Sequence, residues 1–151
     1  MDVLRRNTDY ALRAMVNLAR HYGRESVSTK QIASQENISY QLACKILQRL
    51  HNAKLVESCM GPKGGFRLSR EPSKINLLEL IRATQGPVQL NRCLLGVSEC
   101  PRRPKCTVSN RLAELQRHID GYLGAITLDE LSTSRLMKKS KTKYKSRRKN
   151  V

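Results

Sequence analysis

Residues 28–69 decide the fold, and they read STKQIASQENISYQLACKILQRLHNAKLVESCMGPKGGFRLS. Ser28 and Gln31 stand three residues apart, which is the spacing of a capping box at the start of a helix. A short helix is predicted there, and residues 36–38 form a turn after it. Ser39 can then cap a second helix, whose apolar residues fall on one side: Leu42, Ile46, Leu47 and Leu50. Two helices joined by so short a turn are typical of a helix-turn-helix.

A Gly-rich hairpin is predicted directly after the second helix. Two short segments with strand character, 54–59 and 65–69, flank the sequence Met60-Gly61-Pro62-Lys63-Gly64. Glycine next to proline is strong turn chemistry, so the two segments should pair as a hairpin. A hairpin in this place is the wing of a winged helix-turn-helix domain.

Helices are also predicted on both sides of this stretch. Between Ala11 and Ala19 the apolar residues recur with the period of an amphipathic helix, and Gly23 is a usual terminator. Residues 76–84 form another helix, which Gly86 and Pro87 stop. The predicted fold is therefore mainly α with a small β-wing, and we assign residues 1–87 to the winged helix-turn-helix domain.

Residues 107–132 are predicted to form one long helix. Its apolar residues are spaced alternately four and three apart: Val108, Leu112, Leu115, Ile119, Tyr122 and Ile126. A narrow apolar seam of about three heptads needs a partner helix. We expect this helix to pair two subunits in a homodimer; the alternative is that it packs back on its own domain.

The chain carries a large excess of positive charge. Its 29 Lys and Arg residues face 12 acidic residues, for a formal net charge of +17. Such a balance points to a polyanionic partner, either nucleic acid or an anionic membrane surface. No run of 18 apolar residues is present, so no membrane span is predicted, and we expect a cytoplasmic protein.

The last 19 residues are the most basic part of the chain. Residues 133–151 carry nine Lys or Arg and no acidic residue. We expect a disordered basic tail that adds salt-sensitive affinity for nucleic acid without reading its sequence. A membrane-surface role is the weaker alternative, because the tail lacks the apolar anchor that stable membrane binding requires.

The helix-turn-helix and the wing supply candidate contacts to double-stranded DNA. A helix fits the major groove, where the side chains at its N-terminal end reach base edges. Seven residues are the candidates: Ser39, Tyr40, Gln41, Lys45, Arg49, Lys63 and Arg67. Gln41 suits bidentate hydrogen bonding to adenine, whereas Lys45 and Arg49 suit phosphates and Lys63 lies at the wing tip. For each single base, the alternative is a solvated surface charge.

A cysteine-rich loop is predicted at residues 88–106. Cys93, Cys100 and Cys106 fall within 14 residues, among several basic residues that favour the thiolate form. Thiolates hold iron–sulfur clusters and other metals, although the paired knuckles of common zinc modules are absent. The sequence therefore leaves two interpretations, a metal or cluster site and a set of partly buried or redox-active thiols.

The chain resembles the Rrf2 family of bacterial transcription regulators over residues 1–132. The resemblance rests on Thr8-Asp9-Tyr10-Ala11-Leu12-Arg13, on Gly61-Pro62-Lys63-Gly64-Gly65-Phe66-Arg67-Leu68, on Ile75-Asn76-Leu77-Leu78-Glu79-Leu80-Ile81 and on the three-cysteine loop. It implies a dimeric regulator, with the long helix pairing the subunits. It also implies an iron–sulfur cluster, [2Fe-2S] or [4Fe-4S], held by Cys93, Cys100 and Cys106.

The fourth ligand differs between types of the family. IscR-type members place a histidine three residues after the last cysteine, where this chain has Ser109. NsrR-type members use an aspartate of the first helix as the fourth ligand, and Asp9 stands at the matching position of this chain. The resemblance therefore implies that the partner subunit's Asp9 completes the site. The alternative for Asp9 is a helix-start residue that the helix dipole favours. Met60 stands where the family often has arginine, and Cys44 stands where IscR-type members have an acid.

These observations, with the resemblance, predict a repressor that binds DNA sequence-specifically. An iron–sulfur cluster is expected to control its DNA affinity in response to nitric oxide, iron or redox state. The alternative is a cluster-free regulator that responds through thiol oxidation or a protein partner. An enzyme is not expected, because the three histidines are scattered and no nucleophile–base pattern is present.

Overall fold

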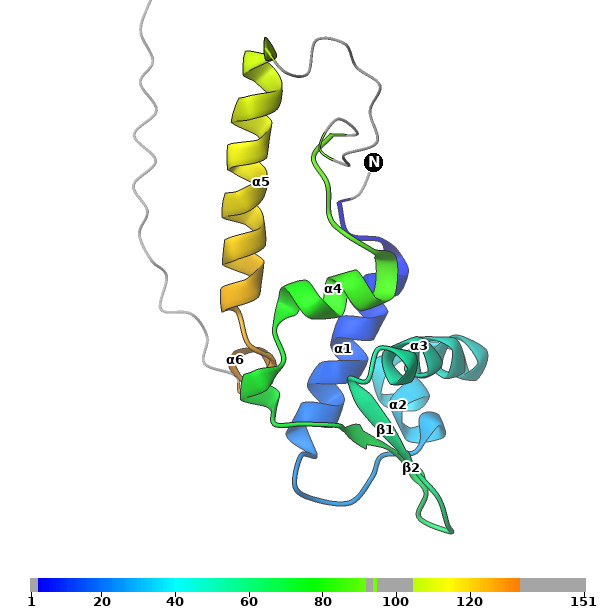
Figure 1. Cartoon of the computed structure of the whole chain (residues 1–151). Helices are drawn as coiled ribbons and strands as arrows, with labels where there is room; N and C mark the ends of the chain where they lie inside the picture. Colours follow the sequence, from blue (N-terminus) through cyan, green and yellow to red (C-terminus); the bar gives the residue numbers. More distant parts are fainter. Residues whose placement is uncertain (1–2, 92–93, 95–104, 134–151) are drawn as a thin grey trace, which may run out of the picture.

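In the computed structural model of the chain, residues 3–91, 94 and 105–133 are described. Most of these residues are helical, and a single hairpin contributes the described sheet (Figure 1). The elements are α1 (Arg6–Arg20), α2 (Thr29–Glu36), α3 (Tyr40–Asn52), β1 (Val56–Cys59), β2 (Gly65–Leu68), the 3₁₀ turn η1 (Pro72–Lys74), α4 (Leu77–Gln85), α5 (Thr107–Ala125) and α6 (Leu128–Ser132). This arrangement confirms the mainly α fold with a β-wing.

Local capping signals set the helix-turn-helix. The Ser28 hydroxyl accepts from the backbone N–H of Gln31, whose side chain accepts in return from the N–H of Ser28, so the capping box is complete. Asn37 ends α2 in the left-handed conformation, which asparagine tolerates better than most residues. Ser39 then caps α3 by accepting from the N–H of Leu42 at 3.2 Å.

The wing is a two-stranded antiparallel hairpin in which Val56 pairs with Leu68 and Cys59 with Gly65. The first strand starts two residues later than the predicted residue 54, because Lys54 has a positive φ of 58° and belongs to the turn after α3. Val27 bridges to Phe66 and holds the hairpin against the loop before α2. Gly65 is required there, since a Cβ atom would lie 2.3 Å from the carbonyl oxygen of Val27.

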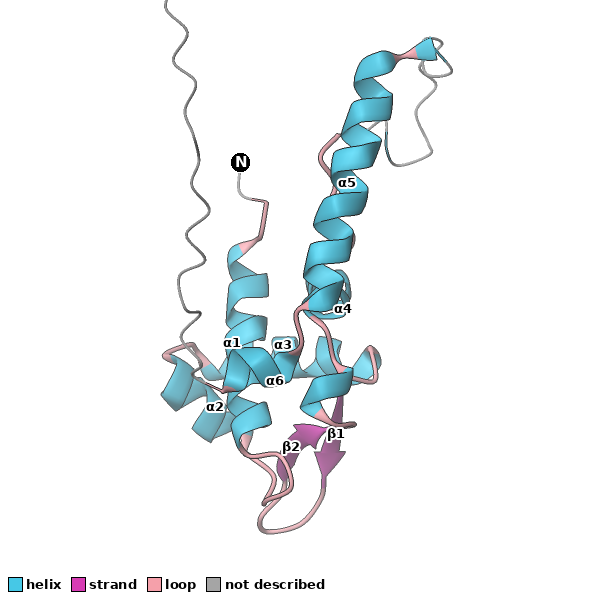
Figure 2. Ribbon diagram, turned by 90° about the vertical axis from the view of Figure 1, so that its left-hand side faces the viewer, coloured by secondary structure: helices cyan, strands magenta, loops and turns pink. Residues whose placement is uncertain are grey.

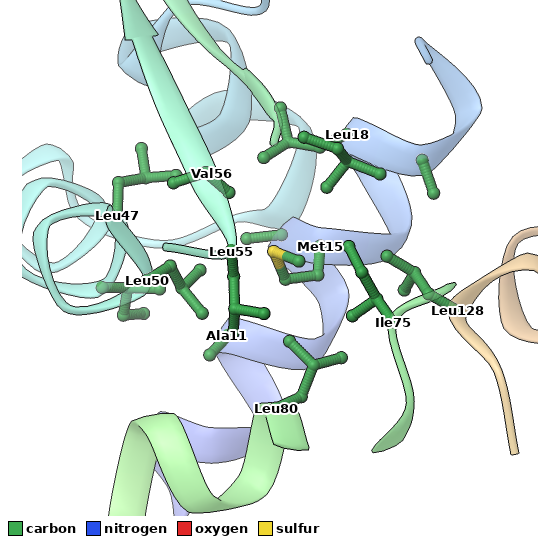
Figure 3. Close-up of a cluster of buried hydrophobic side chains, with 14 of the residues drawn as sticks. Ala11, Met15, Leu18, Leu47, Leu50, Leu55, Val56, Ile75, Leu80 and Leu128 are labelled. Atoms are coloured by element: carbon green, nitrogen blue, oxygen red, sulfur yellow. The ribbon is translucent and has the colours of Figure 1, made fainter. Parts of the chain in front are cut away.

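The hydrophobic core lies around α1, and Figure 3 shows its central side chains. Met15 and Leu18 are buried against Leu47 and Leu50 of α3 and against residues that follow it. Burial of large apolar side chains contributes about 1.5–3 kcal/mol each, so this packing is the main stabilising force on α3 and the wing.

The long C-terminal helix is shorter than predicted. The expected single helix over 107–132 breaks after Ala125, and α6 turns back onto the chain's own core, where Leu128 is fully buried. Backbone pairing enforces the break, because Leu77 donates to the carbonyl of Ile126 and Leu128 donates to that of Ile75. Ile126, expected in the seam, therefore lies outside α5. Of the predicted tail, residues 133–151, only Thr133 lies within the described residues.

Candidate nucleic-acid interface and cysteine loop

The outer face of α3 presents the predicted base-reading residues. Ser39, Tyr40 and Gln41 are exposed at the first turn of the helix, and Lys45 follows one turn later on the same exposed face. The opposite face is buried through Ile46, Leu47 and Leu50. Core packing therefore fixes the helix with its polar N-terminal turn toward solvent, as a helix that enters a major groove requires.

Tyr40 and Cys44 form a pair on this face that the sequence analysis did not identify. The two residues are four apart in α3, so their side chains are neighbours on the helix surface. The Cys44 side chain raises the pKa of the Tyr40 phenol, by hydrogen bonding and by its charge once ionised, with a smaller contribution from burial. Tyr40 thus keeps its hydroxyl proton to higher pH than an ordinary tyrosine and remains a hydrogen-bond donor.

The basic residues of the wing are already paired with acidic residues. The ammonium of Lys63 lies 3.0 Å from the carboxylate of Glu25, and the guanidinium of Arg67 lies 3.1 Å from that of Glu57 on the adjacent strand. All four side chains are largely exposed. Met60 beside Lys63 is 98% exposed. The two acids were not predicted as part of the interface.

Arg49 lies on the same helix but points elsewhere. Its guanidinium Nη1 donates to the carbonyl oxygen of Thr84, in the last turn of α4, at 3.3 Å. Part of its hydrogen-bonding capacity therefore holds α3 against α4. The expected phosphate contact would have to use its remaining donors.

Of the three loop cysteines, only Cys106 lies within the described residues. It is the N-cap of α5, and its half-buried Sγ accepts from the backbone N–H of Ser109 at 3.4 Å. The N-terminal end of a helix stabilises negative charge. Cys93 and Cys100 lie outside the described residues, and among the described residues no three potential ligands come together. Asp9 is exposed in the first turn of α1.

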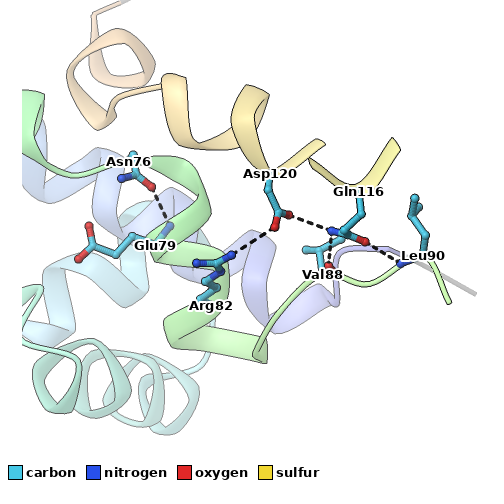
Figure 4. A network of polar contacts seen from close by, with 7 residues as sticks. All are labelled: Asn76, Glu79, Arg82, Val88, Leu90, Gln116 and Asp120. Carbon is cyan, nitrogen blue, oxygen red and sulfur yellow. Dashed lines mark hydrogen bonds and ion pairs between the residues drawn. The ribbon is translucent and has the colours of Figure 1, made fainter. Parts of the chain in front are cut away.

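A polar network fastens the start of the cysteine loop to α5 and α4 (Figure 4). Gln116 of α5 accepts from the N–H of Leu90 at 3.0 Å and donates to the carbonyl of Val88 at 2.8 Å. It also donates to Asp120, whose other carboxylate oxygen lies 3.3 Å from Arg82 of α4. Side chains of α5 and α4 thus link the backbone of Val88 and Leu90, which follow Pro87, to the rest of the domain.

A helix-turn-helix with a hairpin wing and an exposed basic face defines a winged-helix DNA-binding protein. The family model described as "Iron-dependent Transcriptional regulator" (Rrf2) matches residues 4–134. The chain belongs to the Rrf2 family and is a transcriptional regulator of that family, whose members bind DNA. Its relatives are regulators rather than enzymes, which confirms the expectation that it is not an enzyme.

Individual relatives agree with this assignment. The transcriptional regulator IscR of Xenorhabdus nematophila is 32% identical over 81% of this chain and 74% of its own. The regulator NsrR of Shouchella clausii is 33% identical over 71% and 72%. Among solved structures, CymR, the global cysteine regulator of B. subtilis, has a TM-score of 0.72 and 29% identity over 87% of this chain and 97% of its own.

None of the helices in the described ranges is both long enough and apolar enough to cross a membrane.

Proposed function

We propose that the chain acts as a homodimeric repressor that binds double-stranded DNA sequence-specifically and whose affinity is controlled through Cys93, Cys100 and Cys106. Ser39, Tyr40 and Gln41 would read base edges, while Lys45, Lys63 and Arg67 would contact phosphates. The exposed N-terminal turn of α3 supports this proposal, because its outward orientation is fixed by the buried face of the same helix.

The exposed side of α5 supports a dimer. Val108, Leu115 and Tyr122 are spaced by seven residues and are 64%, 49% and 63% exposed in the single chain. Large apolar side chains at heptad spacing pair with a second helix. Two chains joined along α5 would present two α3 helices to half-sites about one DNA turn apart.

The described part of the loop fits an iron–sulfur cluster. Cys106 presents its sulfur at a helix N-terminus, where negative charge is stabilised, and three thiolates are the donor set that such clusters use. The family description as iron-dependent supports the same assignment. Cys93, Cys100 and Cys106 would hold the cluster, with the partner subunit's Asp9 as fourth ligand. A bound cluster would supply sensitivity to nitric oxide, iron supply or redox state.

A cluster-free function is the second candidate. The Cys106 sulfur accepts from the N–H of Ser109, a structural role that a thiol serves by itself, and one structural relative is the S. aureus CymR in an "oxidized form", with a TM-score of 0.67 and 25% identity over 88% of this chain. In this alternative the three thiols respond to oxidants or to a protein partner while the DNA-binding face is unchanged.

Metal analysis separates these functions. Iron and sulfide per subunit, with a visible absorption spectrum, are measured on full-length protein purified without oxygen. Binding to a duplex selected from a randomised DNA pool is compared between wild type and a variant with all three loop cysteines replaced by alanine. Stoichiometric iron and sulfide, both lost in the variant along with control of binding, support the cluster sensor. Metal-free protein whose DNA binding still depends on thiol oxidation supports the second candidate.

A further inference from the structure

The last turn of α4 connects elements that lie far apart. In both views the N-terminal end of α5, which Cys106 caps, lies at the opposite end of the structure from the wing (Figures 1 and 2). Between these ends α4 packs against α1, α3 and α5. A change at the cysteine loop that alters DNA binding within one chain acts over this distance, and α4 packs against three helices along it.

On the side of the loop, one side chain holds two backbone positions. Gln116 uses its amide oxygen for the N–H of Leu90 and its amide nitrogen for the carbonyl of Val88, so both bonds depend on the placement of residues 88–90. The same nitrogen also donates to Asp120, which pairs with Arg82. A shift of the loop start would therefore disturb a network that ends on α4.

On the side of the DNA, the contact is made by Arg49. Its bond to the Thr84 carbonyl lies two residues beyond Arg82, within the same turn of α4. Gln85, the next residue, accepts from the Thr8 hydroxyl at 2.7 Å and from the Arg5 N–H at 2.8 Å, which ties the same turn to the start of α1. One helical turn thus contacts α3, the proposed recognition helix, and the segment that contains Asp9, and it reaches the start of the cysteine loop through Asp120 and Gln116 of α5.

We propose that the last turn of α4 transmits the state of the cysteine loop to the recognition helix, with Gln116 as the positioning residue at the loop and Arg49 as the positioning residue at α3. This inference rests on the proposed function, because it presumes that the loop controls DNA binding. Coupling between distant sites is carried by packed side chains and hydrogen-bond networks of this kind, and residues along them that contact neither ligand change it.

The first test replaces Gln116 with leucine, which keeps the size of the side chain and its helix propensity but removes three hydrogen bonds. Gln89→Leu is the matched control, because Gln89 is exposed beside Val88. The ratio of DNA affinities between protein with intact loop cysteines and the triple alanine variant is measured in each background, with the selected duplex as probe. Gln116→Leu should bring the ratio at least about 2-fold and up to 30-fold closer to 1, whereas Gln89→Leu should leave it unchanged.

Hydrogen exchange of the DNA-free protein provides a second readout. Cysteine replacement should change amide protection in peptides covering 77–91 and 40–52, and Gln116→Leu should abolish the change in 40–52. Altered protection of 40–52 without altered DNA affinity would refute the proposed function and leave the transmission through α4 standing. Two results would overturn the transmission itself. One is that cysteine replacement changes the DNA affinity of Gln116→Leu as much as that of wild type, and the other is that cysteine replacement leaves the amide protection of 40–52 unchanged when Gln116 is present.

The second test asks what Arg49 does. Arg49→Met and Lys45→Met remove the same charge from the same helix. Loss of a phosphate contact lowers the salt dependence of log K by about 0.9, which is the result expected for Lys45→Met. Arg49→Met should instead reduce the change in DNA affinity that cysteine replacement causes, and it should leave the salt dependence of DNA binding near that of wild type. Equal loss of salt dependence in both variants, with the response intact, would make Arg49 a phosphate contact and refute its positioning role.

Discussion

Lys63 at the wing and Glu25 in the loop before α2 form an ion pair, with the ammonium 3.0 Å from the carboxylate. The Ser26 hydroxyl donates to the carbonyl oxygen of Lys63 at 2.7 Å, so the same loop also holds the wing backbone. The basic residue that we propose as a phosphate contact is therefore paired with a carboxylate in the free protein. A DNA phosphate has to displace Glu25 or accept its repulsion.

Replacing Glu25 with glutamine should strengthen DNA binding. The exposed pair is worth about 0.2–1 kcal/mol, so the Kd should fall by roughly 1.4- to 5-fold at low salt, and the gain should shrink as salt rises. Fluorescence anisotropy on the selected duplex measures it. Glu71→Gln is the control, since Glu71 pairs with Lys74 at 3.2 Å and changes the net charge equally. An equal gain in both variants would mean that net charge alone is responsible.

Gln41 is expected to specify a base rather than to add general affinity. Its exposed side chain in the first turn of α3 can make two hydrogen bonds to adenine, worth about 1–3 kcal/mol of discrimination. Repeating the selection with Gln41→Ala should relax one position of each half-site. Gln48→Ala, which removes a side chain bonded to Asn52 near the other end of α3, should leave the recovered sequence unchanged.

The sequence predicted those features whose signal is local. The caps of α2 and α3 depend on residues three apart, and the wing turn depends on five consecutive residues, so their geometry is encoded where it occurs. Five of the seven candidate DNA contacts lie at the N-cap of α3 or within it, where the buried face of the helix determines the exposed one. Periodicity alone therefore placed Tyr40 and Gln41 on the surface.

Features that depend on distant residues were not predicted. Glu25 and Lys63 are 38 residues apart, and Arg49 and Thr84 are 35 apart, so no window of sequence links them. The break after Ala125 has the same origin, because it requires the backbone of Ile75 as a partner for Leu128. Apolar spacing across residues 107–132 gave no sign of it, since Ile126 also fits the heptad pattern.

The Tyr40–Cys44 pair gives an alkaline pH dependence. The pKa of Tyr40 is raised, which means that its contact with Cys44 favours the neutral phenol in the folded protein. The stability that this contact contributes is fully present below the ordinary tyrosine pKa and is lost as pH rises through the raised pKa. Cys44→Ala should shift the titration of Tyr40 to lower pH, which NMR of ring-labelled tyrosine would resolve. Cys59→Ala removes a thiol from the wing instead and should leave Tyr40 unchanged. An unshifted Tyr40 in Cys44→Ala would show that Cys44 is not the cause.

The exposed apolar stripe on α5, formed by Val108, Leu115 and Tyr122, should be the dimer contact. Leu115 is half exposed in the centre of the stripe, between Val108 and Tyr122, and a glutamate there would place two carboxylates in an apolar seam. We expect Leu115→Glu to be a monomer by sedimentation velocity at concentrations where wild type is a dimer. Arg117→Glu, on the same helix but outside the stripe, should remain dimeric.

Two further measurements characterise Leu115→Glu. Because Leu115 is outside the core, this variant should keep the helical circular dichroism of wild type. Its affinity for a two-half-site duplex should approach that for one half-site. A variant that stays dimeric would place the subunit contact elsewhere on the molecule.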